Sequence, residues 1–211
     1  MDQKIIKEWE RTLTDKENLP AIKKNARGFV KEHSVHECWE VAQACWQSPY
    51  FQVQEIASLL CGHIAYQHHE AYLFLRDIVS YHQDWRVQEV LAMSFDCYCQ
   101  SIGYENALSV IHEWLTLSNP NNRRAVSEGL RVWTSKDYFC DHPQIAIQIL
   151  SSLKEDESLY VRKSVGNALK DISKKYPELI INECEQWDLS DKKVKQVYQL
   201  AYKFMKKDNK K

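Results

Sequence analysis

The stretch NPNNRRAVSEGLRVW, residues 119–133, decides the fold, because three other stretches of the chain superpose on it. They are FQVQEIASLL from Phe51, WRVQEVLAMSF from Trp85 and LYVRKSVGNAL from Leu159, and a weaker copy begins near Lys192. The copies are 34, 35, 39 and 33 residues apart when these positions are aligned: Val53, Val87, Asn122, Val161 and Val194. A repeat of this length with two helices per unit is typical of an α-solenoid.

The remaining sequence also predicts helices. We expect helices at 2–14 and 21–32, and a third that Ser34 caps. Glycines and prolines number five each, and no segment alternates at period two for long enough to form a sheet. We therefore predict one all-α domain over residues 1–211, with repeat units clearest from about 49 to 187. The longest spacing marks an insertion at 134–144, either a plain connection or a loop that carries Tyr138 and Phe139 to the rim of a site.

Charge is balanced overall but uneven along the chain. Residues 1–105 carry a net charge of −5 and residues 106–211 carry +4, so a polyanionic partner would mainly meet the second half. The N-terminal segment does not resemble a signal peptide or a membrane-spanning helix, which predicts a cytoplasmic protein with reduced thiols and no membrane contact. The seven cysteines and eight histidines lack zinc spacing, so we predict no metal and expect core positions for the cysteines.

Equivalent positions in successive repeats should lie on the same face of the array. In order, these positions hold Gln54-Glu55, Gln88-Glu89, Arg123-Arg124 and Arg162-Lys163, so the row changes from acidic and amide to basic. Such a row fits a nucleic-acid backbone. The predicted backbone contacts are Arg123, Arg124, Arg162, Lys163, Lys192, Lys193 and Lys195. The alternative is that these cations are solvated or paired with carboxylates such as Glu128.

One carboxylate stands where the basic row begins. Glu89 follows Trp85 by four residues, so both side chains share a helix face. A carboxylate beside an indole suits a positively charged group. The alternative is a core tryptophan, with Glu89 paired to Arg86 or Arg124.

These residues resemble the DNA alkylation repair family of HEAT-like-repeat glycosylases, the AlkD-like and AlkC-like enzymes, from about Phe51 to Trp187. NNRRAVSEGLRVW is similar to an AlkC-like pattern, and LYVRKSVGNALKDISKKYPELI to the repeat that follows it. Trp85 and Glu89 match the AlkD-like Trp-x-x-x-Asp with Glu in place of Asp, and Arg124 follows at the family's distance. Asn167 stands where AlkD-like enzymes have a second tryptophan.

The resemblance implies a HEAT-like solenoid that excises cationic alkylpurines, such as 3-methyladenine and 7-methylguanine, from double-stranded DNA. It implies that Glu89 is the catalytic carboxylate, that Trp85 contacts the deoxyribose and that Arg124 holds the backbone. It gives base-contacting roles to Glu128, Trp133 and Asp171. It implies no metal or organic cofactor. We also expect that no oligomer is required, and that the protein resides in the cytoplasm, on the nucleoid when DNA is bound. A non-catalytic DNA-binding relative and a protein-interaction solenoid are the alternatives.

Overall fold

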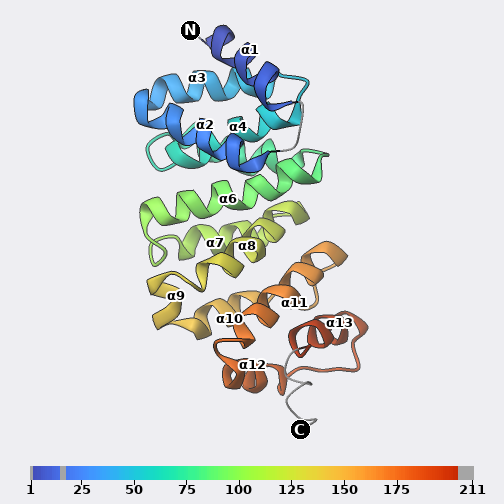
Figure 1. Ribbon diagram of the computed structural model, residues 1–211. Helices are drawn as coiled ribbons and strands as arrows, with labels where there is room; N and C mark the ends of the chain where they lie inside the picture. Colours follow the sequence, from blue (N-terminus) through green and yellow to red (C-terminus); the bar gives the residue numbers. More distant parts are fainter. Residues whose placement is uncertain (1, 15–17, 204–211) are drawn as a thin grey trace. The chain divides into compact units, whose positions relative to one another are not determined.

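The computed structural model describes residues 2–14 and 18–203, without the side chains of Asp2, Leu130, Val132 and Trp133. Throughout these residues the regular elements are helices, and none is a strand (Figure 1), which confirms the all-α fold class. The chain divides into two compact units, unit 1 (Met1–Ala107) and unit 2 (Leu108–Lys211). The prediction of one continuous domain is not tested by this division, and each unit is described by itself.

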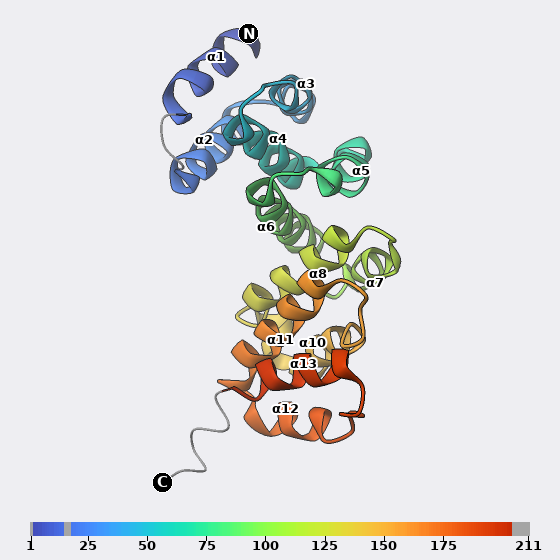
Figure 2. The ribbon, with the colours of Figure 1, turned by 90° about the vertical axis from the view of Figure 1, so that its right-hand side faces the viewer.

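Unit 1 contains six α-helices and a 3-10 helix among its described residues. They are α1 (Asp2–Leu13), α2 (Leu19–Glu32), α3 (Val35–Trp46), α4 (Phe51–Ile64), α5 (His69–Asp77), η1 (Val79–Tyr81) and α6 (Trp85–Ile102). Helix α4 lies at the centre, packed against α2, α3 and α6 (Figures 1 and 2). Its buried face includes Ile56 and Leu60, which are fully buried, as are Leu91 and Phe95 of α6. This apolar interface holds α6 against α4.

Unit 2 repeats this arrangement with seven helices among its described residues. They are α7 (Leu108–Thr116), α8 (Pro120–Trp133), α9 (Asp137–Asp141), α10 (Pro143–Ser151), α11 (Leu159–Ser173), α12 (Pro177–Cys184) and α13 (Lys192–Ala201). Helix α11 is central and packs against α8, α12 and α13. The insertion forms α9, whose Phe139 is fully buried. Phe139 therefore packs in the core and does not reach the rim of a site.

The helix starts follow from short polar caps in the sequence. Ser34 caps α3 as predicted, and with Glu37 it forms a capping box: Glu37 N–H donates to Ser34 Oγ at 3.3 Å and Ser34 N–H donates to Glu37 Oε2 at 2.8 Å. Asp84 caps α6 and Asp191 caps α13, each accepting hydrogen bonds from first-turn amides. These caps fix the residue at which each helix begins, and so fix which side chains occupy its first turn.

Two glycines allow neighbouring helices to approach closely. A Cβ on Gly62 of α4 would lie 2.6 Å from Ser94 Cα of α6, and a Cβ on Gly166 of α11 would lie 2.6 Å from Leu200 Cβ of α13. Beside Gly62, Ser58 and Ser94 share a hydrogen bond of 3.0 Å. Because no larger residue fits without a backbone shift, these contacts set the spacing of the central helices in each unit.

Candidate nucleic-acid interface

The first position of the predicted row faces the turn before its own helix. In unit 1, Gln54 Nε2 donates to Ser48 O at 3.0 Å and to Trp46 O at 3.3 Å. Gln88 Nε2 donates to His82 O at 2.8 Å, and His82 Nε2 is 3.0 Å from Gln54 Oε1. These amides satisfy turn carbonyls and join one repeat to the next, which is a structural role.

Arg123 occupies the same position at the start of α8. Its Nη1 donates to Leu117 O at 2.6 Å and to Ser118 O at 3.0 Å, both in the preceding turn. Its Nε and Nη2 donate to the two carboxylate oxygens of Asp156 at 2.6 and 3.0 Å. The two side chains are only 14% and 5% exposed. This geometry argues against the predicted phosphate contact for Arg123, because its planar donor set is engaged inside unit 2.

Arg162 repeats the arrangement at the start of α11. Its Nη1 donates to Asp156 O and Glu157 O in the preceding turn, and its Nε donates to Gln196 Oε1 of α13 at 3.0 Å. A structural role therefore accounts for Arg162 as it does for Arg123. The sequence patterns did not indicate Asp156. It stands five residues before Val161, the alignment point of its repeat, just as His82 stands five residues before Val87.

The second position of the row is exposed in two of the four aligned repeats and half-buried in a third. Glu89 and Lys163 are exposed and Arg124 is half-buried, whereas Glu55 is 3% exposed. On α13, Lys192 and Lys195 are exposed, and Lys193 donates to Glu157 Oε1 at 2.6 Å. That ion pair is screened, because the Glu157 side chain is 88% exposed. The outward cations of unit 2 are thus Lys163 on α11 and Lys192 and Lys195 on α13, and the half-buried Arg124 precedes them on α8.

Trp85 and Glu89 lie on the first two turns of α6. Trp85 is 58% exposed and Glu89 is exposed one turn further along the same face. The core alternative for Trp85 is therefore wrong. Arg86 is held by Asp84, to which its Nε and Nη2 donate at 2.9 and 2.6 Å, and by the ring of Phe51, whose centroid is 3.5 Å from the guanidinium carbon. Hydrogen bonds from Arg86 lower the pKa of Asp84 despite its partial burial.

The structure brings together Glu128 and Asp171, two predicted base-contacting residues, on the facing helices α8 and α11. Arg131 bridges them: its Nη1 donates to Glu128 Oε2 at 3.1 Å and its Nε to Asp171 Oδ2 at 3.2 Å. Ser164 Oγ donates to Glu128 Oε1 at 2.7 Å, and Lys174 Nζ donates to Asp171 Oδ1 at 2.9 Å. Both carboxylates therefore have protein donors on each oxygen. The third residue of this set, Trp133, ends α8, and its side chain lies outside the described residues.

Burial and hydrogen bonding act in opposite directions on Asp171. Partial burial alone would raise its pKa, but hydrogen bonds from Lys174 and Arg131 outweigh burial and lower the pKa. Asp171 is therefore an ionised carboxylate at neutral pH. Arg131, which no sequence pattern indicated, links the two helices.

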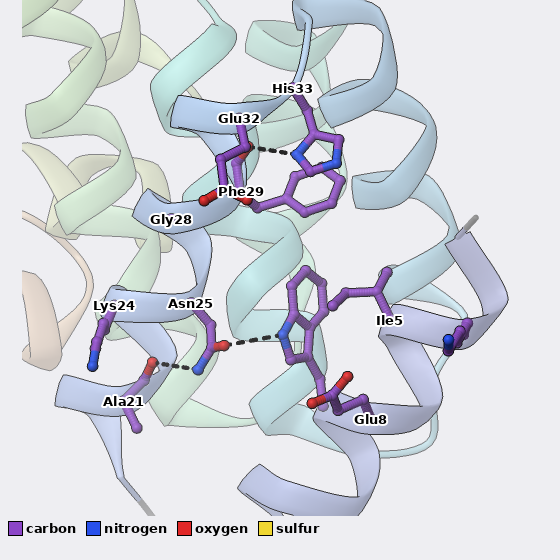
Figure 3. Close-up of a pocket in the computed structure, with 11 residues that line it drawn as sticks. Ile5, Glu8, Ala21, Lys24, Asn25, Gly28, Phe29, Glu32 and His33 are labelled. Atoms are coloured by element: carbon purple, nitrogen blue, oxygen red, sulfur yellow. Dashed lines mark hydrogen bonds between the residues drawn. The ribbon is translucent and has the colours of Figure 1, made fainter.

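Unit 1 has a groove between α1 and α2 that the sequence patterns did not indicate. Its volume is about 650 Å³, and Figure 3 shows Ile5 and Glu8 of α1 opposite Asn25 and Phe29 of α2. Trp9 Nε1 donates to Asn25 Oδ1 at 3.2 Å. The charged side chains that line it are two lysines and two glutamates, Lys4, Lys24, Glu8 and Glu32. This balance does not favour a polyanion, so the groove is not part of the basic surface.

Within the described residues, the chain contains neither a metal site nor a membrane-spanning helix. No group of three or more His, Cys, Asp or Glu side chains in the described residues is arranged to hold a metal ion. No helix among the described residues combines the length and the apolar character needed to cross a membrane.

The comparisons with known proteins agree with this arrangement of helices. The family model of the DNA alkylation repair enzymes matches residues 17–182. The chain belongs to this family. Its structure resembles AlkD2 from Streptococcus mutans, with 42% identity, a TM-score of 0.94, and coverage of 97% of this chain and 99% of that chain. It also resembles smu.31 from S. mutans UA159, with 44% identity, a TM-score of 0.87, and coverage of 94% and 98%.

Two further proteins are similar to this chain over only part of their own length. AlkC from Pseudomonas fluorescens, an alkylpurine DNA glycosylase solved with DNA that contains an abasic site analogue, has 22% identity and a TM-score of 0.61. The match covers 89% of this chain and 57% of AlkC, and supports the HEAT-like fold alone. YhaZ of Bacillus subtilis, described as uncharacterised, is 40% identical over 87 residues, which are 39% of this chain and 24% of YhaZ. The chain therefore spans about a quarter of that curated relative.

Proposed function

We propose that the protein is a DNA repair glycosylase that excises cationic alkylpurines, such as 3-methyladenine and 7-methylguanine, from duplex DNA. The observation that carries the proposal is the exposed pair of Trp85 and Glu89 on α6, in a chain of the DNA alkylation repair family. Glu89 is the proposed catalytic carboxylate, and Trp85 lies beside the deoxyribose of the lesion.

The chemistry of the substrate suits a carboxylate and an indole. An N-alkylated purine already carries positive charge, so the bond between its N9 and the sugar C1′ breaks with both electrons moving to the base, which leaves neutral. The sugar becomes an oxocarbenium-like cation, which the Glu89 carboxylate stabilises electrostatically. Water adds to C1′ and gives a proton to Glu89. Trp85 adds a cation–π attraction of roughly 0.5–2 kcal/mol. These steps require no metal or organic cofactor.

The outward cations of unit 2 are the proposed contacts to the DNA backbone. Lys163, Lys192 and Lys195 are exposed, and Arg124 precedes them in the row. Phosphate contacts of this kind release counterions, so affinity should fall steeply as salt rises. Arg123 and Arg162 are left out of this set because their donors serve the turns of unit 2.

The test is release of methylated purines from alkylated duplex DNA under single-turnover conditions with saturating protein. We expect Glu89→Gln to slow release by at least about 100-fold, the usual effect of losing a preorganised electrostatic group. The matched control is Glu105→Gln, which removes another exposed carboxylate of unit 1 and should leave release unchanged. Absence of release by the natural protein contradicts the proposal.

One observation favours a second candidate, a DNA-binding protein that excises nothing. Glu128 and Asp171 accept hydrogen bonds from protein donors on both oxygens of each carboxylate. Such carboxylates are already neutralised before any lesion arrives. This candidate predicts salt-dependent binding of duplex DNA without release of methylpurine. Binding that is insensitive to Arg124→Ala and Lys163→Ala would instead favour a protein-interaction solenoid.

A further inference from the structure

The exposed large apolar side chains of unit 2, within the residues that the structure describes, gather at two helix starts. Tyr160 is 72% exposed and Leu159 is 42% exposed, both in the first turn of α11. Leu189, 37% exposed, lies in the turn before α13. Exposed apolar groups that cluster in this way indicate a contact surface more strongly than scattered ones.

The starts of α11 and α13 are neighbours. Glu157, just before α11, accepts a hydrogen bond of 2.6 Å from Lys193 in the first turn of α13. One turn further along, Arg162 Nε donates to Gln196 Oε1 at 3.0 Å. These two helix starts therefore lie side by side within unit 2. We call their exposed apolar and basic residues the α11–α13 patch: Leu159, Tyr160, Lys163, Leu189, Lys192 and Lys195.

One lysine of this patch lies on the same helix face as the aromatic ring. Lys163 follows Tyr160 by three residues on the same helix face, and both are exposed. Each acidic side chain of the preceding turn has a cationic partner: Glu155 lies 3.8 Å from Lys154 Nζ, Asp156 pairs with Arg123, and Glu157 pairs with Lys193. An exposed phenol ring with Lys163 on its own helix face, and with Lys192 and Lys195 at the neighbouring helix start, matches the combination of stacking platform and phosphate contacts found where proteins bind single strands.

We propose that the α11–α13 patch binds unpaired DNA nucleotides, with the Tyr160 ring stacked on a base and the lysines on the adjoining phosphates. The inference rests on the proposed function for its partner, DNA, and adds that part of the bound DNA is single-stranded. A duplex presents phosphates but hides the faces of its bases, so it leaves the Tyr160 ring without a stacking partner. An unpaired base offers its π-face whatever its sequence.

The experiment compares single-stranded with double-stranded DNA on the full chain. Fluorescence anisotropy is measured with a labelled single strand of about 16 nucleotides, the upper end of common site sizes, and with the duplex of the same sequence. We expect Tyr160→Ala to weaken single-strand binding by roughly tenfold, as for the loss of one stacked base. Duplex binding should change less than about twofold, and Tyr160→Phe should retain single-strand binding because the ring remains.

Two controls separate stacking from general effects. Tyr66→Ala removes a tyrosine of unit 1 that is 49% exposed and should leave both affinities unchanged. Lys163→Ala should weaken single-strand and duplex binding together, because it removes charge and not a ring. Melting temperatures of all variants are measured, and Tyr160→Ala should melt with the natural protein because the side chain is mostly solvated.

Three outcomes overturn the proposal. In the first, Tyr160→Ala binds single strands as tightly as the natural protein does; in the second, it loses duplex binding to the same extent as single-strand binding. In the third, measured with a labelled poly-glutamate peptide, Tyr160→Ala loses binding of the peptide while single-strand binding persists. The last outcome would identify an acidic protein partner. Excision of methylpurines by Glu89 is read in a separate assay on duplex DNA. Tyr160-dependent single-strand binding without excision would therefore contradict the proposed glycosylase function and support the single-strand site. Excision without Tyr160-dependent single-strand binding would support the glycosylase function and contradict the single-strand site.

Discussion

Asp156 supports the strongest stability prediction, because one carboxylate joins two repeats of unit 2. Its oxygens accept two hydrogen bonds from Arg123, and Oδ1 also accepts one from the Ser158 N–H at 2.8 Å. The Asp156 side chain is 5% exposed. Asp156→Ala leaves the Arg123 guanidinium short of its anionic partner and removes the acceptor of a backbone N–H at the start of α11.

The size of the loss follows from these contacts. Removing one partner of a buried ion pair costs about 3–5 kcal/mol, and the lost acceptor of Ser158 adds about 1 kcal/mol or more. Arg123 retains two carbonyl acceptors, Leu117 O and Ser118 O, which soften the penalty. We therefore expect the free energy of unfolding of unit 2 to fall by about 3 kcal/mol. The exposed pair of Lys193 and Glu157 predicts less than about 1 kcal/mol for Glu157→Ala.

The assay is urea unfolding followed by tryptophan fluorescence. Trp114 and Trp187 are buried in unit 2 and report on its unfolding, while Trp9 reports on unit 1. With an m-value of roughly 2 kcal/mol per molar urea, Asp156→Ala should lower the midpoint of unit 2 by about 1.5 M. Equal midpoints for Asp156→Ala and Glu157→Ala would refute the reasoning that the Arg123–Asp156 pair is structural.

Further substitutions test the packing, the carboxylate cluster and the outward cations. Gly62→Ala should lower the free energy of unfolding of unit 1, measured with urea, by about 1–3 kcal/mol, because the new Cβ meets the Ser94 backbone. Gly28→Ala places its new Cβ where no atom lies within 4 Å, and should raise the free energy of unfolding by about 0.5–1 kcal/mol. The pKa of Asp171 is lowered in the fold, so its contribution is present above the unfolded pKa of about 3.9 and is lost as pH falls below it. The stability gap between the natural protein and Asp171→Asn, measured by urea unfolding at several pH values, should therefore shrink below about pH 4; a constant gap would contradict this. Lys163→Ala should reduce the slope of log affinity against log salt by about 1 and leave the urea midpoint unchanged.

Much of the fold could be predicted from the sequence because its signals are local or periodic. The capping box of Ser34 involves neighbours three residues apart, and the repeat spacing gives the succession of helices without any long-range information. The division into two units could not be predicted in this way. The boundary follows Ala107, where one helix pair follows the next without a proline-rich or glycine-rich linker, so the amino-acid composition does not mark it.

The candidate site was predictable in part. The exposure of Trp85 is consistent with its place at the first residue of a capped helix, where no preceding turn covers it. The bridge from Arg131 to Glu128 and Asp171 could not be predicted, because Asp171 lies 40 residues away along the chain. Which partner a guanidinium selects depends on the spacing of two helices, and the sequence pattern does not contain that distance.

The two positions of the repeated row serve different ends because of helix geometry. Successive residues point about 100° apart around a helix, so when Arg123 and Arg162 turn toward the carbonyls before their helices, the next residue in each repeat is directed elsewhere. The first position is then constrained by backbone carbonyls whose hydrogen bonds must be satisfied, and amides meet the same need at Gln54 and Gln88. Lys163, at the second position, is instead exposed to solvent. Of the four cations at these positions on α8 and α11, Arg124 and Lys163 therefore remain as proposed DNA contacts. Mutagenesis of Arg123 or Arg162 should change stability, whereas mutagenesis of Lys163 should change binding.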